Sequence, residues 1–285
     1  MELTPTELER YRRQMQLPGL GREGQEKLKS TTALVTGVGG LGGTVALYLT
    51  VAGIGKLILV RGGDLLLDDM NRQILMTHDW VGQPRVIKAK ETLKNINPDV
   101  EITAIPEYIT ADNVDALVQQ SDLVLDCAHN FDERNLANAT CIRWHKPMVE
   151  AAMNGMEAYL TTIIPGKTPC LSCIFPEKPD WDRWGFGVLG AVSGTLACLS
   201  ALEAIKLITG LGNPLTGILL AMDLGNADFR KLRPYHDPNC PVCGNLSGNS
   251  NQNLGESLSK TLSRKQSQGW KESSPISSPG IVHSI

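Results

Sequence analysis

A glycine-rich run directly after an apolar segment constrains this chain more than any other feature. Residues 33–35 have the character of a buried strand, and a G-x-G-x-x-G run follows, built from Gly37, Gly39 and Gly42 with Gly40 between them. Glycines allow a tight turn and a close approach of the backbone, and a helix that begins there offers unpaired N–H groups to a phosphate. The run predicts a nucleotide-binding turn; the alternative is a tight turn that binds nothing.

The segments around this turn alternate between strand and helix patterns. A helical stretch leads to a second apolar strand at 56–60, which completes a βαβ unit. Further helices are expected at 85–97, 113–120 and 134–144, and further strands at 101–106, 122–126 and 147–151. This alternation is typical of a Rossmann-like, doubly wound α/β fold with a mostly parallel sheet. The irregular connections before 159–164 and 217–222 predict that these C-terminal strands are antiparallel.

Composition divides the chain into three parts. Residues 1–30 carry alternating charges and predict an N-terminal helical arm, and residues 31–244 are expected to form the nucleotide-binding domain. Residues 245–285 are rich in Ser, Asn, Gln and Gly and are expected to be a disordered tail. Residues 185–202 carry no charge, but their glycines predict a buried loop that leads into a core helix, rather than a membrane span.

Charge and the N-terminal residues limit the partners and the compartment. The chain has 27 Lys and Arg against 30 Asp and Glu, so no overall field attracts nucleic acid or an anionic membrane. The first residues mix charges of both signs and contain no apolar run of the kind found in a signal peptide. We therefore expect a cytoplasmic protein whose partners include neither nucleic acid nor a membrane.

Four of the seven cysteines form two Cys-x-x-Cys pairs, Cys170 with Cys173 and Cys240 with Cys243. Two thiolates at this spacing can reach the same ion, and two such pairs complete a tetrahedral site with no position left for water. An odd number of cysteines argues against a disulfide framework. We predict a structural Zn²⁺ site, with a redox-active disulfide pair as the alternative. The remaining cysteines lie in apolar settings and are expected to be buried; they are Cys127, Cys141 and Cys198.

The residue after the second strand is Arg61. Dinucleotide-binding folds place an Asp or Glu there for the ribose hydroxyls, whereas an arginine suits a 2′-phosphate. An NADP-dependent oxidoreductase therefore stays open as an alternative, although no substrate-domain pattern follows the turn.

Further motifs follow one another along the chain. They are Arg10-Tyr-Arg-Arg-Gln14, GVGGLGG, Asn71-Arg72-Gln73, Gly82-Gln-Pro-Arg85 and the two cysteine pairs. Together they resemble the HesA/MoeB/ThiF family, relatives of the ubiquitin-activating enzymes, and are most similar to its HesA members. The resemblance covers about residues 6 to 244. It implies ATP-dependent adenylation of the C-terminal carboxylate of a ubiquitin-like or sulfur-carrier protein, usually by a homodimer.

The resemblance also implies roles for three arginines. Arg13 matches an arginine that the partner subunit inserts into the site, Arg72 matches one that contacts the phosphates, and Arg85 stands where the family has a lysine. The reaction needs such cations because charge on the α-phosphate must be neutralised while pyrophosphate leaves. Taken singly, each arginine also fits a solvated surface charge.

Three departures from the family pattern fall in the expected ATP site. Arg61 replaces the ribose-binding aspartate, and Asp68 and Asp69 replace a Ser-Asn pair. His129, just before Asn130, replaces the aspartate associated with Mg²⁺. Imidazole is a poor ligand for Mg²⁺, which prefers oxygen. Magnesium-dependent turnover is therefore expected to be weak unless another carboxylate substitutes; the candidates are Asp64, Asp68, Asp69, Asp126 and Asp132.

Some relatives carry a cysteine between the zinc pair and the core helix, where it forms a covalent link to the partner or a persulfide. No cysteine lies between Cys173 and Cys198 here, so we expect no covalent thiol step. Trp181 and Trp184 occupy that region and fit either a core or a partner surface. A nucleotide-binding scaffold that has lost adenylation and assists metal or sulfur cofactor assembly is the second hypothesis.

Overall fold

The computed structural model describes residues 1–177 and 187–244. The predictions for Trp181 and Trp184, for the first residues of the 185–202 segment and for the tail at 245–285 lie outside these residues.

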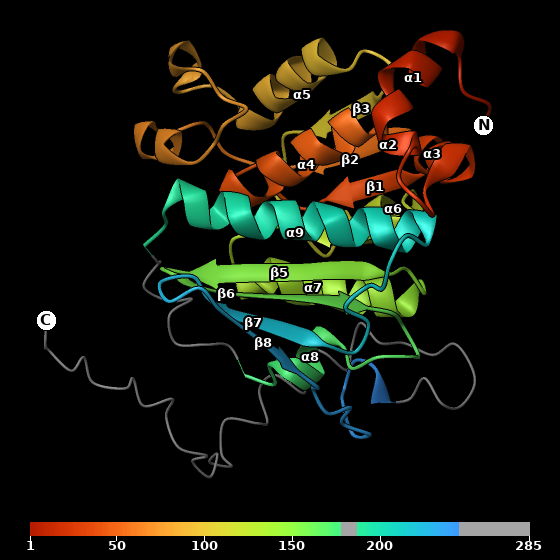
Figure 1. The fold of residues 1–285 in the computed structure, drawn as a ribbon. Helices are drawn as coiled ribbons and strands as arrows, with labels where there is room; N and C mark the ends of the chain where they lie inside the picture. The colour runs from red at the N-terminus through yellow and green to blue at the C-terminus, as the bar shows by residue number, and fades with distance from the viewer. Residues whose placement is uncertain (178–186, 245–285) are drawn as a thin grey trace, which may run out of the picture. The chain divides into compact units, whose positions relative to one another are not determined.

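An eight-stranded sheet organises the described residues, with its strands in the order β3-β2-β1-β4-β5-β6-β7-β8 (Figure 1). The strands are β1 (Thr32–Val35), β2 (Lys56–Val60), β3 (Glu101–Ile105), β4 (Leu123–Asp126), β5 (Met148–Asn154), β6 (Glu157–Ile163), β7 (Leu219–Asp223) and β8 (Asp228–Leu232). The strands from β3 to β5 in this order run parallel, and β6, β7 and β8 extend the sheet in antiparallel pairs. The predicted mostly parallel sheet with antiparallel C-terminal strands is confirmed.

The central strands are apolar on both faces because helices cover both faces of the sheet. Ala33, Leu34 and Val35 of β1 are fully buried. Since successive side chains of a strand point to opposite faces, Ala33 and Val35 belong to one core cluster and Leu34 belongs to the other. Val35 is paired with Leu125 of β4, which brings the ends of these two strands together.

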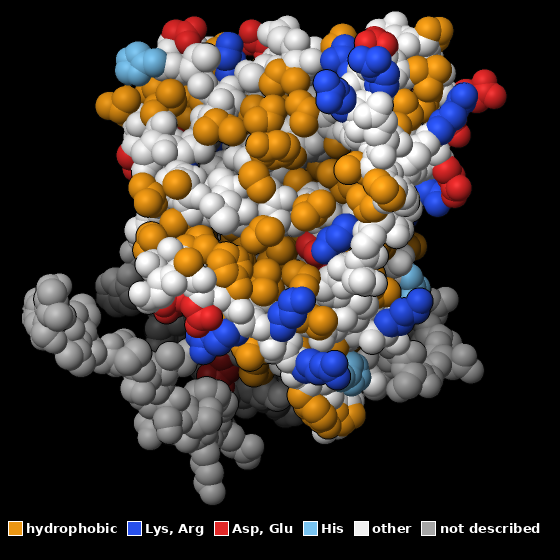
Figure 2. All heavy atoms as spheres, in the orientation of Figure 1, with side chains coloured by type: hydrophobic (Ala, Val, Ile, Leu, Met, Phe, Trp, Pro, Cys, Tyr) orange, Lys and Arg blue, Asp and Glu red, His pale blue; other side chains and the backbone are white. Residues whose placement is uncertain are grey.

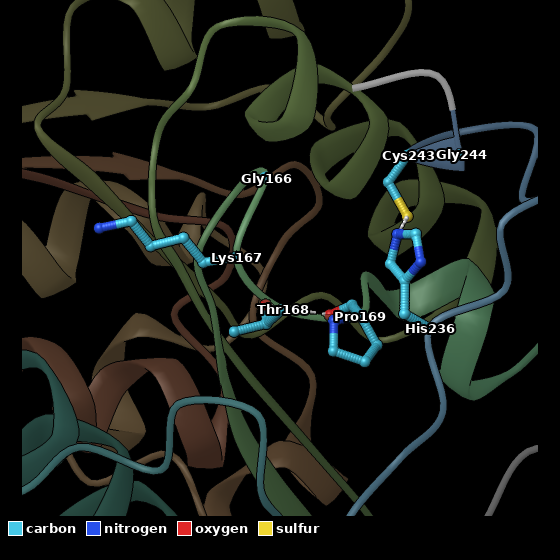
Figure 3. A pocket seen from close by; sticks show the side chains of 7 residues that line it. All are labelled: Gly166, Lys167, Thr168, Pro169, His236, Cys243 and Gly244. Atoms are coloured by element: carbon cyan, nitrogen blue, oxygen red, sulfur yellow. Dashed lines mark hydrogen bonds between the residues drawn. The ribbon is translucent and has the colours of Figure 1, made fainter. Parts of the chain in front are cut away.

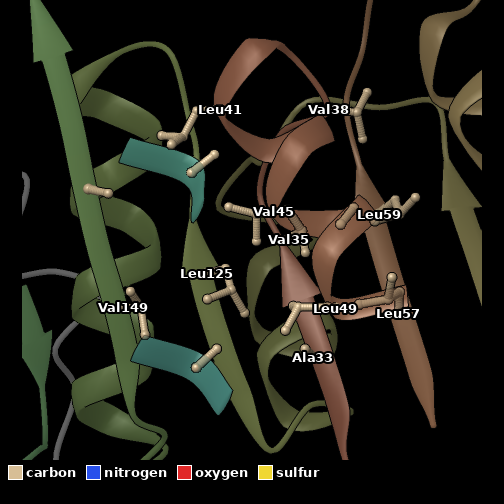
Figure 4. Close-up of a cluster of buried hydrophobic side chains, with 14 of the residues drawn as sticks. Ala33, Val35, Val38, Leu41, Val45, Leu49, Leu57, Leu59, Leu125 and Val149 are labelled. Carbon is tan, nitrogen blue, oxygen red and sulfur yellow. The ribbon is translucent and has the colours of Figure 1, made fainter. Parts of the chain in front are cut away.

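One layer of helices lies on each face of the sheet. The first layer contains α4 (Gly40–Ala52), α5 (Arg85–Ile96) and α9 (Gly190–Thr209), and the second contains α6 (Val114–Gln119) and α7 (Phe131–Arg143). In Figure 4, Val45 and Leu49 of α4 lie over Val35 and Leu57 of the sheet. This two-layer cover is the doubly wound arrangement that the alternating pattern predicts.

Helix α9 has the length and apolar composition that would allow a helix to span a membrane. In this protein it lies beside α4 across the sheet (Figure 1), and 44% of its most apolar window is buried. Leu196, Ala197 and Ala204 belong to the core. The opposite face of the helix is an exposed stripe that consists of Ala191, Thr195, Cys198 and Leu202.

Residues 1–30 contain the helices α1 (Pro5–Arg10), α2 (Arg12–Met15) and α3 (Gly21–Ser30). Gln14 donates a hydrogen bond of 2.8 Å to the carbonyl oxygen of Ala52, the last residue of α4. Gly53 then ends α4 with a φ of 82°, and a Cβ atom there would lie 2.4 Å from the ring of Tyr11. The N-terminal helices are therefore fixed against the end of α4 that is opposite the glycine-rich turn.

Candidate functional site

The glycine-rich turn lies at the carboxyl ends of the parallel strands, where the sheet order reverses between β1 and β4. In open α/β sheets, ligands bind in the crevice at this switch point. We call the region around this switch point the crevice. It consists of the residues that follow β1, β2 and β4, of the 3₁₀ helix η1 (Leu67–Asn71) and of the start of α5. Two shorter elements elsewhere are η2 (His78–Trp80) and α8 (Leu171–Ile174).

Close backbone contacts require two of the glycines in the turn. A Cβ atom on Gly42 would lie 1.9 Å from the carbonyl oxygen of Gly37, and a Cβ atom on Gly37 would lie 2.5 Å from the carbonyl oxygen of Cys127. Gly39 is the N-cap of α4, and no side chain of the described residues caps the N–H groups that follow it, beginning with that of Gly40. These open N–H groups, at the positive end of the helix dipole, are suited to a phosphate.

Asp69 joins the two arginines that are predicted to contact phosphates. Its Oδ1 atom lies 2.8 Å from Nη2 of Arg72, and its Oδ2 atom lies 3.0 Å from Nη1 of Arg85. Oδ2 also accepts a hydrogen bond of 3.0 Å from the backbone N–H of Leu66. Asp69 and Arg85 are buried. The two guanidinium groups therefore share one buried carboxylate, which balances part of their charge when no ligand is bound.

Arg72 and Arg85 approach the crevice from two sides. The Cβ atom of Arg72 lies 3.0 Å from the point that a Cβ atom on Gly40 would occupy, so Arg72 adjoins the start of α4. Arg85 donates hydrogen bonds to the carbonyl oxygens of Gly63, at 3.3 Å, and Asp64, just after β2. The structure thus brings both arginines to the crevice, and their roles there stay predictions.

Arg61 follows β2 and reaches across to the end of β4. Its Nη1 atom lies 2.9 Å from Nδ1 of His129, and its guanidinium carbon lies 5.3 Å from the centre of the Tyr108 ring. A guanidinium only donates, so Nδ1 of His129 accepts this bond. Burial and, after it, the charge of Arg85 lower the pKa of Arg61. Among the described residues, no carboxylate lies within ion-pair distance of Arg61, unlike Arg72 and Arg85.

Asn130 caps the helix that follows β4. Its Oδ1 atom accepts a hydrogen bond of 2.9 Å from the backbone N–H of Glu133, and its amide donates one of 2.7 Å to Oε1 of the same residue. This Oε1 atom lies 3.6 Å from Nδ1 of His129. Burial raises the pKa of Glu133. Asn130 therefore positions α7, and its predicted contact with a nucleotide stays a prediction.

A buried ionic cluster beneath the crevice was missed by the sequence reasoning. Nη1 of Arg134 donates to Oδ2 of Asp126 at 3.0 Å and to Oε1 of Glu150 at 2.9 Å, and Nη2 donates to the carbonyl oxygen of Ala128. Tyr159 donates to the same Oε1 atom at 3.0 Å, and Oε2 of Glu150 has no hydrogen-bond partner in the part of the chain that the structure describes. Burial raises the pKa of Glu150 well above its usual value. The sequence features that could have indicated this cluster are an aspartate at the end of a buried strand and an arginine in the next helix.

Among the described residues, the carboxylates around the crevice do not form a magnesium site. Asp69 is bound by two arginines, and Asp126 is bound by the buried arginine beneath the crevice. Asp64, Asp68 and Asp132 are exposed. His129 offers nitrogen where a carboxylate would be needed, and that nitrogen already contacts a guanidinium. Because Mg²⁺ prefers carboxylate and water oxygens, the residues present do not fit the ion that the family resemblance implies.

The four cysteines of the two pairs form a cluster, and their sulfur atoms all lie within 4.8 Å of one another. Sγ of Cys170 lies 3.7 Å from Sγ of Cys240, and Sγ of Cys173 lies 3.4 Å from Sγ of Cys243. All four are free thiols. Hydrogen bonds from the thiols of Cys170 and Cys243 lower the pKa of Cys240. Four sulfur donors at this spacing fit a tetrahedral metal ion, so the cluster can hold a metal as the motifs predict.

His236 adjoins the cysteine cluster and was not predicted. Its Nε2 atom lies 3.5 Å from Sγ of Cys243 (Figure 3). A cavity of about 230 Å³ opens beside these two residues and is also lined by Gly166, Lys167, Thr168, Pro169 and Gly244. Imidazole N–H groups next to metal-binding atoms commonly orient the ligand set. The sequence feature that could have indicated this contact is a histidine four residues before Cys240.

Arg13 lies far from the crevice of its own chain. It is exposed on α2, which contacts the last residue of α4, whereas the glycine-rich turn precedes the first residue of α4. A helix of this length spans about 20 Å at 1.5 Å per residue. The structure therefore does not bring Arg13 together with Arg72 and Arg85 within one chain.

The three cysteines outside the cluster differ in exposure. Cys141 is buried, and burial raises the pKa of the Cys127 thiol well above its usual value. The expectation that all three are buried holds for Cys141 only: Cys127 is half-buried, and Cys198 is exposed because it falls on the uncovered face of α9. The raised pKa keeps the Cys127 thiol, which lies beside the glycine-rich turn, protonated.

A doubly wound sheet, a glycine-rich turn at its switch point and a four-cysteine cluster agree with the family of adenylyltransferases that is related to the ubiquitin-activating enzymes. A model of the ThiF family matches residues 11–242, and the chain belongs to this family. The predicted family and fold are confirmed.

Several curated proteins are similar over most of their length. The chain is 72% identical to the heterocyst HesA protein of Trichormus variabilis over 86% of this chain and 92% of that protein. It is 38% identical to the sulfur carrier protein adenylyltransferase of Thermus thermophilus, over 86% of this chain and 94% of that protein. The crystal structure of E. coli MccB with ATP is 26% identical, with a TM-score of 0.68, and the match covers 78% of this chain and 69% of that one.

Proposed function

We propose that this protein uses ATP to adenylate the C-terminal carboxylate of a ubiquitin-like or sulfur-carrier protein. Membership of the ThiF family supports adenylyl transfer. The Thermus thermophilus relative, which is named as a sulfur carrier protein adenylyltransferase, supports this class of partner. The MccB structure with ATP supports the use of the same nucleotide.

The proposed reaction needs charge and positioning rather than a nucleophile from this chain. A carboxylate oxygen of the partner attacks the α-phosphorus of ATP, a new P–O bond forms, and the bond from the α-phosphorus to the departing pyrophosphate breaks. The products are an acyl-adenylate and pyrophosphate. Preorganised cations stabilise the charge that develops on the phosphate oxygens. The raised pKa of Cys127 agrees with a mechanism that uses no cysteine.

The observation that carries the proposal is that Arg72 adjoins the open N-terminus of α4 and that Asp69 joins Arg72 to Arg85. The free N–H groups that begin with Gly40 are suited to one phosphate. Two guanidinium groups held by Asp69 stand beside them and are suited to the others. Phosphate oxygens that enter the crevice compete with Asp69 for these two arginines.

Exchange of labelled pyrophosphate into ATP tests the proposal. We expect exchange only when a ubiquitin-like sulfur-carrier protein with a free C-terminal carboxylate is present. The matched control is the same carrier with a C-terminal amide. Arg72→Ala is expected to lower exchange roughly 100-fold, whereas Arg230→Ala, on the exposed strand β8, is expected to leave it unchanged. ATP binding without exchange would contradict adenylation.

We also propose a homodimer in which the second copy covers α4 and α9. Figure 2 shows hydrophobic side chains gathered over these helices, and Tyr48, Val51 and Leu202 are 45%, 41% and 47% exposed there. A two-fold axis across α4 would place the far end of one α4 beside the glycine-rich turn of the other. Arg13 of the second copy would then reach the crevice.

Mixing two inactive variants tests this arrangement. Arg13→Ala and Arg72→Ala proteins are each expected to be inactive, and their mixed dimers are expected to regain exchange because one of the two sites is intact. No recovery, with mixed dimers demonstrated by mass, would contradict a contribution of Arg13 from the partner.

Zn²⁺ is the metal that we propose for the cysteine cluster. Four thiolates fill a tetrahedral ion, so its role is to stabilise the fold rather than to take part in adenylation. Free thiols throughout the described residues fit a reducing compartment, and we propose a cytoplasmic protein. Neither nucleic acid nor a membrane is part of this proposal.

A nucleotide-binding scaffold without adenylation is the second candidate. The contact between Arg61 and His129 favours it, because the family pattern has an aspartate at both positions. ATP binding without pyrophosphate exchange would be its signature. The NADP-dependent alternative has only Arg61 in its favour, and binding of NADPH in the same titration would be needed to support it.

A further inference from the structure

Two departures from the family pattern touch each other in this structure. Arg61 stands where the resemblance implies an aspartate for the ribose, and His129 stands where it implies an aspartate for Mg²⁺. The two positions are 68 residues apart in the sequence, and their side chains meet at 2.9 Å. A guanidinium therefore lies against the position at which the family pattern would hold a metal ion.

Among the described residues, no carboxylate lies within ion-pair distance of the Arg61 guanidinium, although Glu133 and Asp69 lie near enough to interact with its charge. Tyr108 lies under it and His129 accepts one of its hydrogen bonds, but neither carries a negative charge in this contact. A partly buried cation without a directly contacting anion is unfavourable. An anionic ligand that enters the crevice would supply this contact.

The other two crevice arginines are in a different state. Arg72 and Arg85 are bound to Asp69, so a ligand meets them already paired. Arg61 lies beyond ion-pair distance of that carboxylate among the described residues, although Arg85 is close enough to influence its pKa. The most available positive charge in the crevice is therefore that of Arg61.

We propose that this crevice binds the triphosphate of ATP without a divalent metal, because Arg61 supplies, beside His129, the positive charge that Mg²⁺ supplies in the family pattern. The carboxylates that would hold the ion are either bound to arginines or exposed. The inference rests on the nucleotide binding in the proposed function, and it does not require that adenylation follows.

Calorimetric titration tests the inference on the unmodified, zinc-loaded protein. Buffers are freed of Mg²⁺ with a chelating resin rather than a soluble chelator, so that the cysteine cluster keeps its metal. We expect the Kd for ATP to be the same within about twofold with and without excess MgCl₂, because a charge-assisted contact with Arg61 replaces the ion. Binding that is tenfold or more tighter with Mg²⁺, or no binding in either buffer, would overturn the inference.

Two sets of variants sharpen the result. Arg61→Gln is expected to weaken the binding of metal-free ATP roughly tenfold or more, and Arg230→Gln, on an exposed strand, is the matched control. The double variant Arg61→Asp with His129→Asp restores both aspartates and is expected to bind ATP only with Mg²⁺. Melting temperature and zinc content report whether each variant folds. The titrations with and without Mg²⁺ use the unmodified protein and do not depend on any variant.

The outcome for adenylation is separate. Metal-independent ATP binding without pyrophosphate exchange would keep this inference and contradict the proposed function. Pyrophosphate exchange together with strictly Mg²⁺-dependent ATP binding would support the proposed function and contradict this inference.

Discussion

The cysteine cluster and the nucleotide crevice differ in what they retain of the family pattern. The cluster has all four thiols that the two motifs predict, with their sulfur atoms within 4.8 Å of one another. The crevice has the glycine-rich turn, but the residues after β2 and β4 and in η1 have changed charge. Arg61, Asp69 and His129 are the changed residues that contact other charged or polar side chains.

This difference follows from the kind of atom with which each site binds its ligand. A metal ion is bound by side-chain atoms, so the loss of one thiolate removes a quarter of its ligands. A phosphate at a helix N-terminus is bound by backbone N–H groups, which any residue supplies. The side chains around such a turn are therefore freer to change, and with them the charge that the crevice presents to the rest of the nucleotide.

Breaking the cluster is expected to have the largest effect. Cys240→Ser removes a thiolate that the two neighbouring thiols stabilise. Because metal-binding energy is also folding energy, we expect a loss of about 3 kcal/mol or more and a fall in Tm of roughly 6–12 °C. Calorimetry with zinc quantification measures both, and Cys198→Ser, which is exposed and outside the cluster, is the control. Full zinc content in the Cys240 variant would refute the four-thiolate site.

Breaking the ionic cluster beneath the crevice comes next. Arg134→Ala leaves Asp126 and Glu150 buried without their cation. Removing one member of such a group is expected to cost about 3–5 kcal/mol, measured by urea unfolding. Arg143→Ala, on the same helix, removes only an exposed pair with Asp115 and is expected to cost no more than about 1 kcal/mol. Equal losses for the two variants would mean that burial of the cluster is unimportant.

Adding a side chain to the glycine-rich turn tests the part of the crevice that keeps the family pattern. A Cβ atom on Gly42 would lie 1.9 Å from a carbonyl oxygen, so Gly42→Ala is expected to cost about 1–3 kcal/mol and to abolish ATP binding. Gly194→Ala places its Cβ atom in open space within α9 and is expected to stabilise by about 0.5–1 kcal/mol. Undiminished ATP binding by the Gly42 variant, measured by titration, would show that the turn does not hold the nucleotide.

The pH dependence of stability reports on Glu150. Its folded-state pKa is raised above the ordinary value of 4.5, chiefly by burial. Its contribution to stability is therefore complete below about pH 4.5 and is lost as the pH rises through the folded-state pKa, at up to about 1.4 kcal/mol per pH unit. Glu150→Gln removes this titration, so we expect the stability of the variant to rise relative to that of the wild type over the range in which the pH increases above about 4.5. Parallel unfolding curves across this range would contradict a raised pKa.

The smallest expected effect concerns the competition between Asp69 and phosphate. Asp69→Asn removes the charge that binds Arg72 and Arg85. We expect ATP affinity to rise about threefold to tenfold, which corresponds to roughly 0.6–1.4 kcal/mol. Asp68→Asn is the matched control, because the adjacent side chain is exposed. Weaker ATP binding by the Asp69 variant, measured by titration, would mean that the carboxylate positions the arginines rather than competes for them.

The sequence predicted the buried elements of the fold to within a few residues. β1, β2, β4 and α5 were expected from apolar periodicity, glycine and Pro98, and they form close to the expected ranges. β8 was not predicted, because all of its residues are exposed and it lacks an alternating apolar pattern. The division of the N-terminal arm into three helices was also missed, because short helices held by contacts with α4 have little local signal.

The residues of the site were predicted better than their contacts. The glycines and cysteines belong to motifs with fixed spacing, so their chemistry can be predicted from residues that are close in the sequence. The meeting of Arg61 with His129 depends on strand order and on the reach of two long side chains. The same holds for Arg134 with Glu150, which are brought together by the pairing of β4 with β5.

The distance along the chain between the two cysteine pairs also sets an order of events in synthesis. Cys170 and Cys240 are 70 residues apart, and α9, β7 and β8 lie between them. At a translation rate of roughly 5–20 residues per second, the second pair is made about 4–14 s after the first. During that interval a newly made chain has two thiols in place and no complete ligand set. Full metal coordination is therefore a late event in the synthesis of each chain. It occurs only after the antiparallel end of the sheet has been made.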